Sequence, residues 1–266
     1  GGYADVWKGI YCAQDVAVKV IRTYSTDDLL KIMKRLCKEV VMWRFLRHPN
    51  ILPLLGVSMT ENQFAVVSEW MRNGNINQFV RAHPEVNRLK LLEGVAKGLI
   101  YLHINEMVHG DLKGMNILID ETGQARLADF GLLTIVSDPE NTTSSSSYGH
   151  GGTVRWMSPE LIDPESFGFE KCRPTKPSDC YALGMVIYET ISGNVPFQGY
   201  RSHTVSLKVV RGERPRREAK FEDSLWNMLE LCWASSPNDR PSVEDVLHGL
   251  EMVSKLREPP AREGSK

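Results

Sequence analysis

The amino-acid sequence predicts an α+β fold with two lobes, a small β-rich lobe followed by a larger helical lobe. The first fifth of the chain contains short runs that alternate between apolar and polar positions, as half-buried strands do. Beyond Asn73 and Gly74, most apolar residues recur at the spacing of amphipathic helices. At 266 residues and 42% hydrophobic, the chain can bury the core that such a fold needs.

The small lobe is expected to contain strands on both sides of one helix. The strands are expected at 6–11, 15–21, 52–57 and 64–68. Between the second and third strands, apolar residues recur at helical spacing from about 25 to 45, and the polar residues that begin this run can cap a helix. The sequence therefore predicts a helix at 25–45 that ends before His48 and Pro49.

The larger lobe is expected to be mainly helical. Helices are expected at 88–107, 178–192 and 223–233, and two short strands at 117–120 and 125–128 are joined by a turn at Gly123. The sequence contains no internal repeat, and one low-complexity run, N-T-T-S-S-S-S, occupies 141–147. Residues 256–266 are expected to form a polar tail.

Composition and charge argue against several function classes. Lys plus Arg number 32 and Asp plus Glu number 33, so a net charge of -1 provides no positive surface for nucleic acid or an anionic membrane. The five cysteines are scattered and form no C-x-x-C pair, so a disulfide framework or a thiolate zinc site is not expected. The apolar runs are too short to span a bilayer. These features predict a cytoplasmic protein with no nucleic-acid binding and no membrane insertion.

The strand motif V-A-V-K contains a lysine that can serve a phosphate-binding site. Lys19 alternates with the apolar Val18 and Val20, and a strand lysine of this kind ordinarily faces solvent. If Lys19 points into a cleft instead, it needs a carboxylate to hold it extended toward phosphate oxygens. Glu39 in the expected helix is the candidate partner, although these two residues alone leave an ordinary solvated glutamate as the alternative.

The segment H-G-D-L-K-G-M-N carries the clearest chemical signal. Within one short loop it contains an acid, Asp111, a cation, Lys113, and a carboxamide, Asn116. The acid can accept the proton of an attacking hydroxyl, the cation can steady a transferring phosphoryl group, and the amide oxygen suits magnesium. A polar turn is the alternative, because Asp, Gly and Asn all favour turns. The segment D-F-G follows across a tight hairpin and adds a second oxygen ligand, Asp129.

These motifs occur in an order that resembles the eukaryotic protein kinases over almost the whole chain. The resemblance implies a protein-kinase-like two-lobe domain at 1–255, with the N-lobe at 1–71 and the C-lobe at 72–255. It also implies ATP and Mg²⁺ as cofactors and a protein as the substrate, and it leaves the regulatory partners unspecified. By the same resemblance, Asp111 is the catalytic base, Lys113 steadies the phosphate, and Lys19 pairs with Glu39.

The resemblance also implies a set of nucleotide contacts. These are Gly1, Gly2, Val6, Ala17, Lys19, Ser68, Glu69, Met71, Asn116 and Asp129. Gly1 and Gly2 match the later part of the glycine-rich phosphate loop, and the segment S-E-W-M matches the gatekeeper and the hinge that hold adenine through main-chain groups. Asn116 and Asp129 match the magnesium ligands.

A few positions indicate a finer class. Lys113 and Thr153 resemble Ser/Thr kinases, whereas the segments W-M-S-P-E, L-C-W and D-R-P-S resemble the tyrosine-kinase-like branch. The chain therefore resembles a tyrosine-kinase-like kinase with Ser/Thr specificity. The resemblance further implies that Asp179 braces the catalytic loop and that Glu160 and Arg240 form a buried ion pair.

Three departures from the family pattern matter. Gly110 stands where most kinases carry an arginine that binds a phosphate on the activation loop. We therefore expect activity that does not strictly depend on phosphorylation of this loop. The Thr and Ser run at 142–147 is expected to be a flexible spacer. Ala4 stands where the phosphate loop commonly has its last glycine, which affects ATP affinity more than competence. The chain begins inside that loop, so the N-lobe is expected to lack its first strand and the chain to be a fragment of a longer protein.

The expected function is ATP-dependent phosphorylation of Ser or Thr hydroxyls in proteins. A kinase-shaped scaffold with weak or no catalysis is the alternative, because the phosphate loop is shortened. Such scaffolds typically lose the lysine, the base or the metal aspartate, yet Lys19, Asp111, Asn116 and Asp129 are all present. A small-molecule kinase on the same fold is a third alternative, less favoured because the segment around Thr153 resembles protein kinases.

Overall fold

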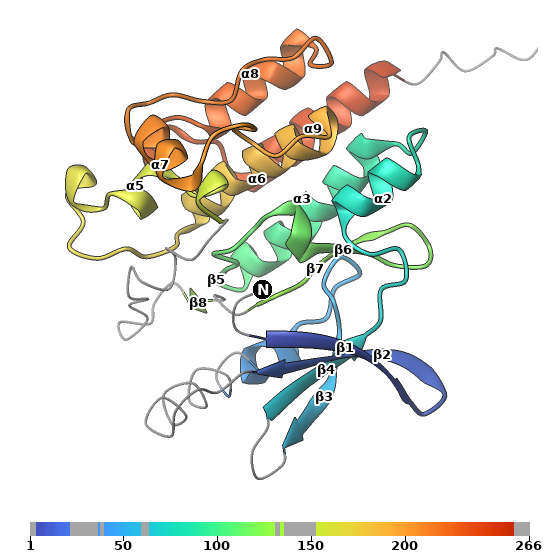
Figure 1. Ribbon diagram of the computed structural model, residues 1–266. Coiled ribbons are helices and arrows are strands. Elements are labelled where there is room, and N and C mark those ends of the chain that lie inside the picture. Colours follow the sequence, from blue (N-terminus) through green and yellow to red (C-terminus); the bar gives the residue numbers. More distant parts are fainter. Residues whose placement is uncertain are drawn as a thin grey trace, which may run out of the picture.

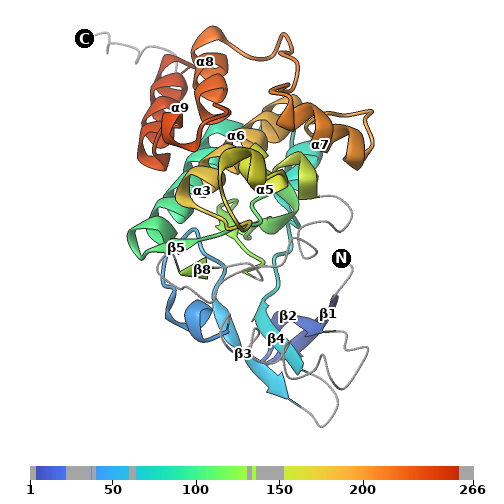
Figure 2. The ribbon, with the colours of Figure 1, turned by 90° about the vertical axis from the view of Figure 1, so that its left-hand side faces the viewer.

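The computed structural model describes residues 4–21, 37, 40–59, 64–130, 134–135 and 153–257. Figure 1 shows a small sheet at one end of the molecule and a larger group of helices at the other. The two-lobe α+β prediction is therefore confirmed. In the view of Figure 2, turned by 90°, the short ladder of β5 (Met107–Val108) and β8 (Thr134–Ile135) again lies between the sheet and the helices.

The small lobe is built on a four-stranded antiparallel sheet in the order β1-β2-β4-β3. Its strands are β1 (Ala4–Tyr11), β2 (Gln14–Ile21), β3 (Leu54–Met59) and β4 (Phe64–Glu69). Each lies within two residues of its predicted position. The central β4 has the most buried residues, and the outer β1 leaves apolar side chains exposed. Burial in the sheet is therefore greatest at β4 and least at the outer strand β1.

The β1–β2 hairpin turns at Cys12 and Ala13, which both have positive φ, 47° and 62°. Tyr11 pairs with Gln14 across this two-residue loop. Positive φ at both central positions is the geometry of a type I′ turn, whose twist matches that of the flanking strands. Neither residue is a glycine, so the tight hairpin carries backbone strain.

The helix predicted at 25–45 lies only partly within the described residues, where residues 37 and 40–45 are helical. Met42 and Trp43 on its inner side are buried. The indole Nε1 of Trp43 donates a hydrogen bond of 2.6 Å to the carbonyl oxygen of Leu52, just before β3. This bond ties the end of the helix to the segment that enters the sheet.

Two helices of 17 residues form the centre of the large lobe, α3 (Arg88–Ile104) and α6 (Lys176–Ser192). Every residue of α6 after Pro177 is buried, so this helix runs through the middle of the core, and its few polar side chains, including Asp179, are buried with it. Thr175 and Ser178 form a capping box at its start, and Gly193, with φ of 80°, ends it in the left-handed conformation. Sequence-local signals therefore define both ends of the central helix.

The other elements of the large lobe surround this pair of helices. They are α2 (Ile76–Ala82), β6 (Ile117–Ile119), β7 (Ala125–Leu127), α5 (Pro159–Ile162), α7 (Ser202–Val210), α8 (Asp223–Cys232) and α9 (Val243–Arg257). The sequence reading predicted α8, β6 and β7 and did not predict α2, α5, α7 or α9. Helix α9 continues through Arg257, so it extends two residues into the expected tail. Within the described residues, no helix combines the length and apolarity needed to cross a bilayer.

Candidate active site

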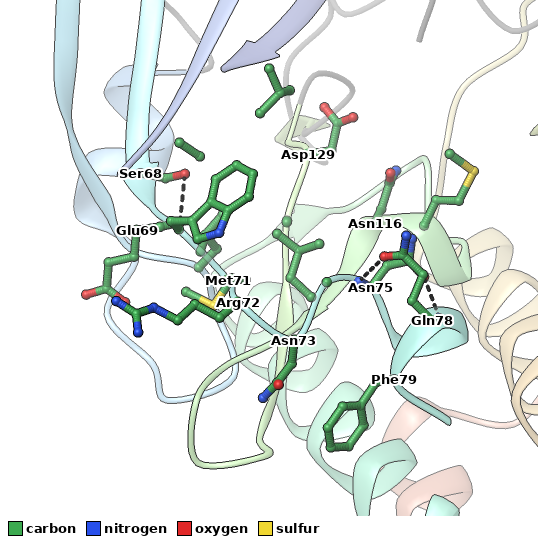
Figure 3. Close-up of a pocket in the computed structure, with 18 of the residues that line it drawn as sticks. Ser68, Glu69, Met71, Arg72, Asn73, Asn75, Gln78, Phe79, Asn116 and Asp129 are labelled. Carbon is green, nitrogen blue, oxygen red and sulfur yellow. Dashed lines mark hydrogen bonds between the residues drawn. The ribbon is translucent and has the colours of Figure 1, made fainter. Parts of the chain in front are cut away.

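A cavity of about 760 Å³ opens between the sheet and the large lobe. Every nucleotide contact that the sequence predicted and the structure describes lines it: Val6, Ala17, Lys19, Ser68, Glu69, Met71, Asn116 and Asp129. Figure 3 shows the segment from Ser68 to Arg72 on one side of this cavity, with Asp129 and Asn116 across from it. Strands β1, β2 and β4 thus supply one wall, and the segments before β6 and after β7 supply the other.

Three predicted site residues, Gly1, Gly2 and Glu39, lie outside the described residues. Their expected roles, and the Lys19–Glu39 pair with them, stay predictions. Lys19 itself lies on β2 opposite Val66 of β4. Its side chain is not directed only at solvent, because Nζ donates to Oδ1 of Asp129 across the cavity.

Asp129 combines an unusual backbone with a charged neighbourhood. Its φ of 61° is rare for a residue with a side chain. Burial raises the pKa of its carboxyl group, but the charge and the hydrogen bond of Lys19, with the charges of Lys113 and His109, outweigh that effect and hold the pKa below its ordinary value. Asp129 is therefore ionised at neutral pH, with 42% of its side chain exposed toward the cavity.

The loop before β6 brings the predicted base, cation and amide together. Oδ2 of Asp111 accepts a hydrogen bond of 2.7 Å from Nζ of Lys113 and one of 3.0 Å from Nδ2 of Asn116. Nζ of Lys113 also donates to the Thr153 hydroxyl at 3.0 Å. The other oxygen of Asp111, Oδ1, is buried and has no hydrogen-bond partner among the described residues. A buried acceptor of this kind costs free energy unless a ligand completes it.

Asp179 on α6 holds the same loop through its backbone, as predicted. Its carboxylate accepts hydrogen bonds from the amide of His109 at 2.8 Å and from the amide of Gly110 at 2.9 Å. Nε2 of His103 on α3 lies 2.9 Å from the same carboxylate. Gly110 has φ of 76°, a conformation that glycine adopts without the steric penalty that other residues incur. The glycine therefore suits the backbone of this loop.

An aromatic column connects the lobes behind the cavity. The rings of Trp43 and Phe130 are 5.1 Å apart, and the rings of Phe130 and His109 are 5.7 Å apart. Trp43 also lines the cavity, and sequence reasoning had assigned it only to the apolar side of a helix. Its spacing predicted burial but could not tell which partner it packs against.

The sequence reading also missed a charged contact at the cavity. Arg72, which lines it, donates to Oδ2 of Asp15 at 2.8 Å, and Nζ of Lys8 lies 3.1 Å from the same oxygen. These bonds join the β1–β2 hairpin to the segment that follows the expected hinge. No local motif marks Arg72, because its partner lies 57 positions away.

The predicted ion pair between Glu160 and Arg240 is confirmed. Nη1 and Nη2 of Arg240 each lie 2.7 Å from one oxygen of the Glu160 carboxylate, and both residues are buried. The Ser158 hydroxyl donates to the same carboxylate at 2.7 Å. This bidentate pair ties α5, which contains Glu160, to the turn before α9.

The protein oxygens at the cavity fit a magnesium ion that shares its ligands with a nucleotide. Asn116 uses its amide nitrogen for both of its hydrogen bonds to Asp111, so its amide oxygen is left to act as a ligand beside Asp129. Among the described residues, no cluster of three or more His, Cys, Asp or Glu side chains could hold a metal ion. Magnesium is commonly held by one or two protein oxygens together with substrate phosphates and water.

Comparison of the sequence with known proteins identifies similar protein kinases. Residues 1–250 match the family model described as protein tyrosine and serine/threonine kinase. The chain is 30% identical over 260 residues to serine/threonine-protein kinase STY46 of Arabidopsis thaliana, covering 96% of this chain and 43% of that protein. It is 27% identical over 259 residues to serine/threonine/tyrosine-protein kinase HT1 of the same plant, covering 94% of this chain and 63% of that protein.

A third relative is probable serine/threonine-protein kinase drkD of Dictyostelium discoideum. It is 30% identical over 264 residues, which cover 97% of this chain and 19% of that protein. The chain thus spans less than two thirds of the length of each relative, and nearly all of its own length takes part in each match. With the family model matching residues 1–250, the chain belongs to the protein tyrosine and serine/threonine kinase family.

Proposed function

We propose that this chain transfers the γ-phosphate of ATP to Ser or Thr hydroxyls of proteins, with Asp111 as the base. The observation that carries this proposal is the buried, unpartnered Oδ1 of Asp111. That oxygen has the chemistry to accept the proton of an incoming hydroxyl, while Oδ2 is already engaged by Lys113 and Asn116. The site thus provides one acceptor for a substrate and keeps the carboxylate oriented.

Each of the other residues has a separate task in this proposal. Lys113 steadies the phosphoryl group, and its bond to Thr153 links it to the segment that receives the acceptor protein. Lys19 binds phosphate oxygens from β2. To do so, its ammonium group exchanges its hydrogen bond to Asp129 for bonds to the phosphate. Asn116 and Asp129 hold Mg²⁺, which supplies neutralisation of the phosphate charge. Main-chain groups of the segment at 69–71 bind adenine.

A Ser/Thr acceptor is favoured by the contact between Lys113 and Thr153 and by the names of the relatives. We assign the catalytic unit to 1–255, with lobes at 1–71 and 72–255. All five cysteines are free thiols, which fits a reducing compartment such as the cytoplasm. Phosphoamino-acid analysis of a phosphorylated generic protein tests the acceptor, and we expect phosphoserine and phosphothreonine with little phosphotyrosine.

The alternative is a scaffold without catalysis. It is disfavoured because the described catalytic groups are not scattered: Asp111, Lys113 and Asn116 are hydrogen-bonded to one another, and Lys19 meets Asp129. Incubation with Mg²⁺, labelled ATP and a basic protein substrate separates the two functions. We expect label in the substrate with the wild-type chain and not with Asp111→Asn, and equal label from both would contradict the catalytic proposal.

We also propose that catalysis does not strictly depend on phosphorylation of the activation loop. The backbone amides of His109 and Gly110 donate hydrogen bonds to Asp179 on α6. The catalytic loop is therefore held by α6 without an arginine side chain at position 110. The Thr and Ser residues at 142–147, which lie outside the described residues, can all be replaced by alanine. We expect that variant to keep its activity, and loss of activity in a folded variant would contradict this part of the proposal.

A further inference from the structure

Asp15, near the start of β2, lies beside the segment at 69–71 that is proposed to bind adenine, and the proposed chemistry does not use it. Its main-chain carbonyl accepts a hydrogen bond of 3.2 Å from the amide of Trp70. Its carboxylate oxygen Oδ2 accepts a hydrogen bond of 2.8 Å from Nη2 of Arg72. One residue of the small-lobe sheet therefore binds the chain on both sides of Met71, which lines the cavity.

The strand pairing shows which edge of this segment is open. Strand β4 lies between β2 and β3 in the sheet. Its pairing with β3 ends at Ser68, whereas its pairing with β2 reaches Glu69. The hydrogen bond between Trp70 and Asp15 extends the contact with β2 by one residue. Among the described residues, the segment at 69–71 thus has a strand partner on the β2 side alone, and the same segment lines the cavity.

Two cations share the Asp15 carboxylate. Nζ of Lys8, on β1, lies 3.1 Å from the oxygen that Arg72 binds. The Asp15 side chain is 21% exposed, whereas those of Lys8 and Arg72 are 51% and 68% exposed. The hydrogen bond and charge of Lys8, with those of Arg72, hold the pKa of Asp15 below its ordinary value against the opposing effect of burial. The carboxylate is therefore ionised at neutral pH and binds both cations.

The two cations connect Asp15 to different parts of the chain. Lys8 belongs to β1, which is already joined to β2 by a continuous antiparallel ladder. Its ammonium also lies 5.8 Å from the centre of the Trp70 ring, within the range of a cation–π contact. Arg72 lies just beyond the sheet, and Figure 3 shows its side chain directed away from Asp129. Its bond to Asp15 thus ties the end of the segment at 69–71 to the sheet.

We propose that Asp15 is a positioning residue that holds the segment at 69–71 against β2 in the conformation that binds adenine. This inference rests on the proposed function, which assigns adenine to main-chain groups of that segment. Asp15 is not among the described residues that line the cavity, so it acts on a ligand through the segment that it holds. A segment that is fixed before the ligand arrives loses less freedom on binding, which raises affinity.

Equilibrium binding of two ligands, Mg²⁺-ATP and adenosine, tests the proposal in the wild type and in Asp15→Ala. Adenosine has no phosphate, so its affinity reports on the adenine contacts without Lys19 or magnesium. We expect Asp15→Ala to weaken both ligands by the same factor, about 2- to 5-fold, the scale on which exposed ion pairs act. In steady-state kinetics, KM for ATP should rise by this factor, while kcat and KM for the protein substrate stay unchanged.

A double-mutant cycle with Arg72 tests the route of the effect. Arg72 lines the cavity, so Arg72→Met can weaken ATP both by releasing Asp15 and by removing a contact of its own. Asp15 is expected to act only through its partner. In the Arg72→Met background, Asp15→Ala should therefore have almost no further effect on adenosine affinity. An undiminished effect in that background would overturn the proposal.

Glu106→Gln is the matched control in the large lobe. It breaks an ion pair of 2.8 Å with Lys176, and the two side chains are 62% and 36% exposed. We expect unchanged affinity for both ligands. Lys8→Met leaves the bond between Asp15 and Arg72 in place, so it should weaken the ligands less than Asp15→Ala does.

Hydrogen exchange of the ligand-free protein provides a readout that is independent of catalysis. Exchange in the peptide containing Trp70 should accelerate in Asp15→Ala and not in Glu106→Gln, because the Trp70 amide donates to the Asp15 carbonyl. Weakened ATP with unchanged adenosine would place the effect on the phosphates and contradict the inference. Wild-type affinity for both ligands in a folded Asp15→Ala would also contradict it. A wild-type chain that binds neither ligand would refute the proposed function instead, and the exchange comparison would still decide whether Asp15 holds the segment.

Discussion

The two lobes present their parts of the site in different ways. In the large lobe, the catalytic loop rests on α6 through Asp179 and Glu189, both almost fully buried. In the small lobe, Lys19 stands on a sheet whose outer strand exposes large apolar side chains, and its side chain contacts Asp129 of the other lobe. The proposed acceptor half of the site is therefore pre-organised by buried hydrogen bonds, whereas the proposed nucleotide half includes a partly exposed ion pair between the lobes.

Dielectric screening explains why this difference matters. Hydrogen bonds to a buried carboxylate are strong because little water competes for it. The Lys19 and Asp129 side chains are 31% and 42% exposed, so water and salt weaken their attraction. In a partly exposed pair, one member is easily exchanged for another partner, as the phosphate contact proposed for Lys19 requires. The comparison predicts large stability effects in the large lobe and mainly functional effects at the nucleotide half.

The largest stability effect is expected from Arg240→Met. It leaves the buried Glu160 carboxylate without its cation, which should lower the free energy of unfolding by about 3–5 kcal/mol. Arg257→Met is the matched control, since it breaks an ion pair with Glu222 whose members are 41% and 49% exposed. The control should cost about 1 kcal/mol or less. Urea midpoints of both variants measure the difference, and equal midpoints would break the comparison.

Lys19→Met is expected to act on function and hardly on stability. Loss of the ammonium should lower kcat/KM for ATP by about 100-fold, or about 2.7 kcal/mol in the transition state. The urea midpoint should change less than in Arg240→Met, because the contact with Asp129 is partly exposed. A large loss of stability with unchanged ATP kinetics would reverse the assignment of Lys19. Lys8→Met, which removes another β-strand lysine that contacts an aspartate, provides the control.

A smaller effect, with a defined pH dependence, is expected from Glu189→Gln. The folded protein raises the pKa of Glu189, so the folded state binds this proton more readily than the unfolded chain. Wild-type stability from this group is therefore greatest at low pH and is lost as pH rises from the unfolded pKa, about 4.3, through the folded pKa. Glutamine has no such loss. The stability of the variant relative to wild type should improve from pH 5 to pH 8, and a constant difference would contradict this.

The smallest effect is expected at the hairpin of the small lobe. Ala13→Gly relieves a positive φ of 62° and should raise the free energy of unfolding by about 0.5–1 kcal/mol. Ala17→Gly lies in a strand, where it should destabilise instead. Thermal unfolding of the two variants gives opposite shifts in Tm if the turn has the described geometry. Activity should be unaffected by Ala13→Gly.

Local sequence patterns predicted the parts of the fold that depend on local signals. The strands of the small lobe and the long helices α3, α6 and α8 follow from alternation, helical spacing and caps. Helices α2 and α5, with 7 and 4 residues, are too short to show a reliable period. Helix α9 did contain a signal, because Val243, Val246, Leu250 and Val253 recur on one side, and the sequence reading passed over it.

The residues of the candidate site also fall into two groups, those that lie in local sequence motifs and those that are recognised only by contacts between distant positions. Lys19, Asp111, Asn116 and Asp129 lie in short motifs, so sequence order was enough to predict them. Glu189 had only a weak signal, one of two acids in a mostly apolar helix, and its bond to Gly114 spans 75 positions. Contacts of that kind follow from how helices pack, which a single sequence does not specify residue by residue.

The most direct measurement combines ATP affinity with phosphoryl transfer in the wild-type chain and in Asp111→Asn. The variant keeps Lys19, Asp129 and Asn116, so it should bind Mg²⁺ and ATP within about threefold of the wild-type Kd, a difference of under about 1 kcal/mol. Its transfer to protein serine should fall by about 10²- to 10⁴-fold, the range for loss of a general base. Undiminished transfer by a folded Asp111→Asn, or loss of transfer explained by loss of ATP binding, would contradict the account.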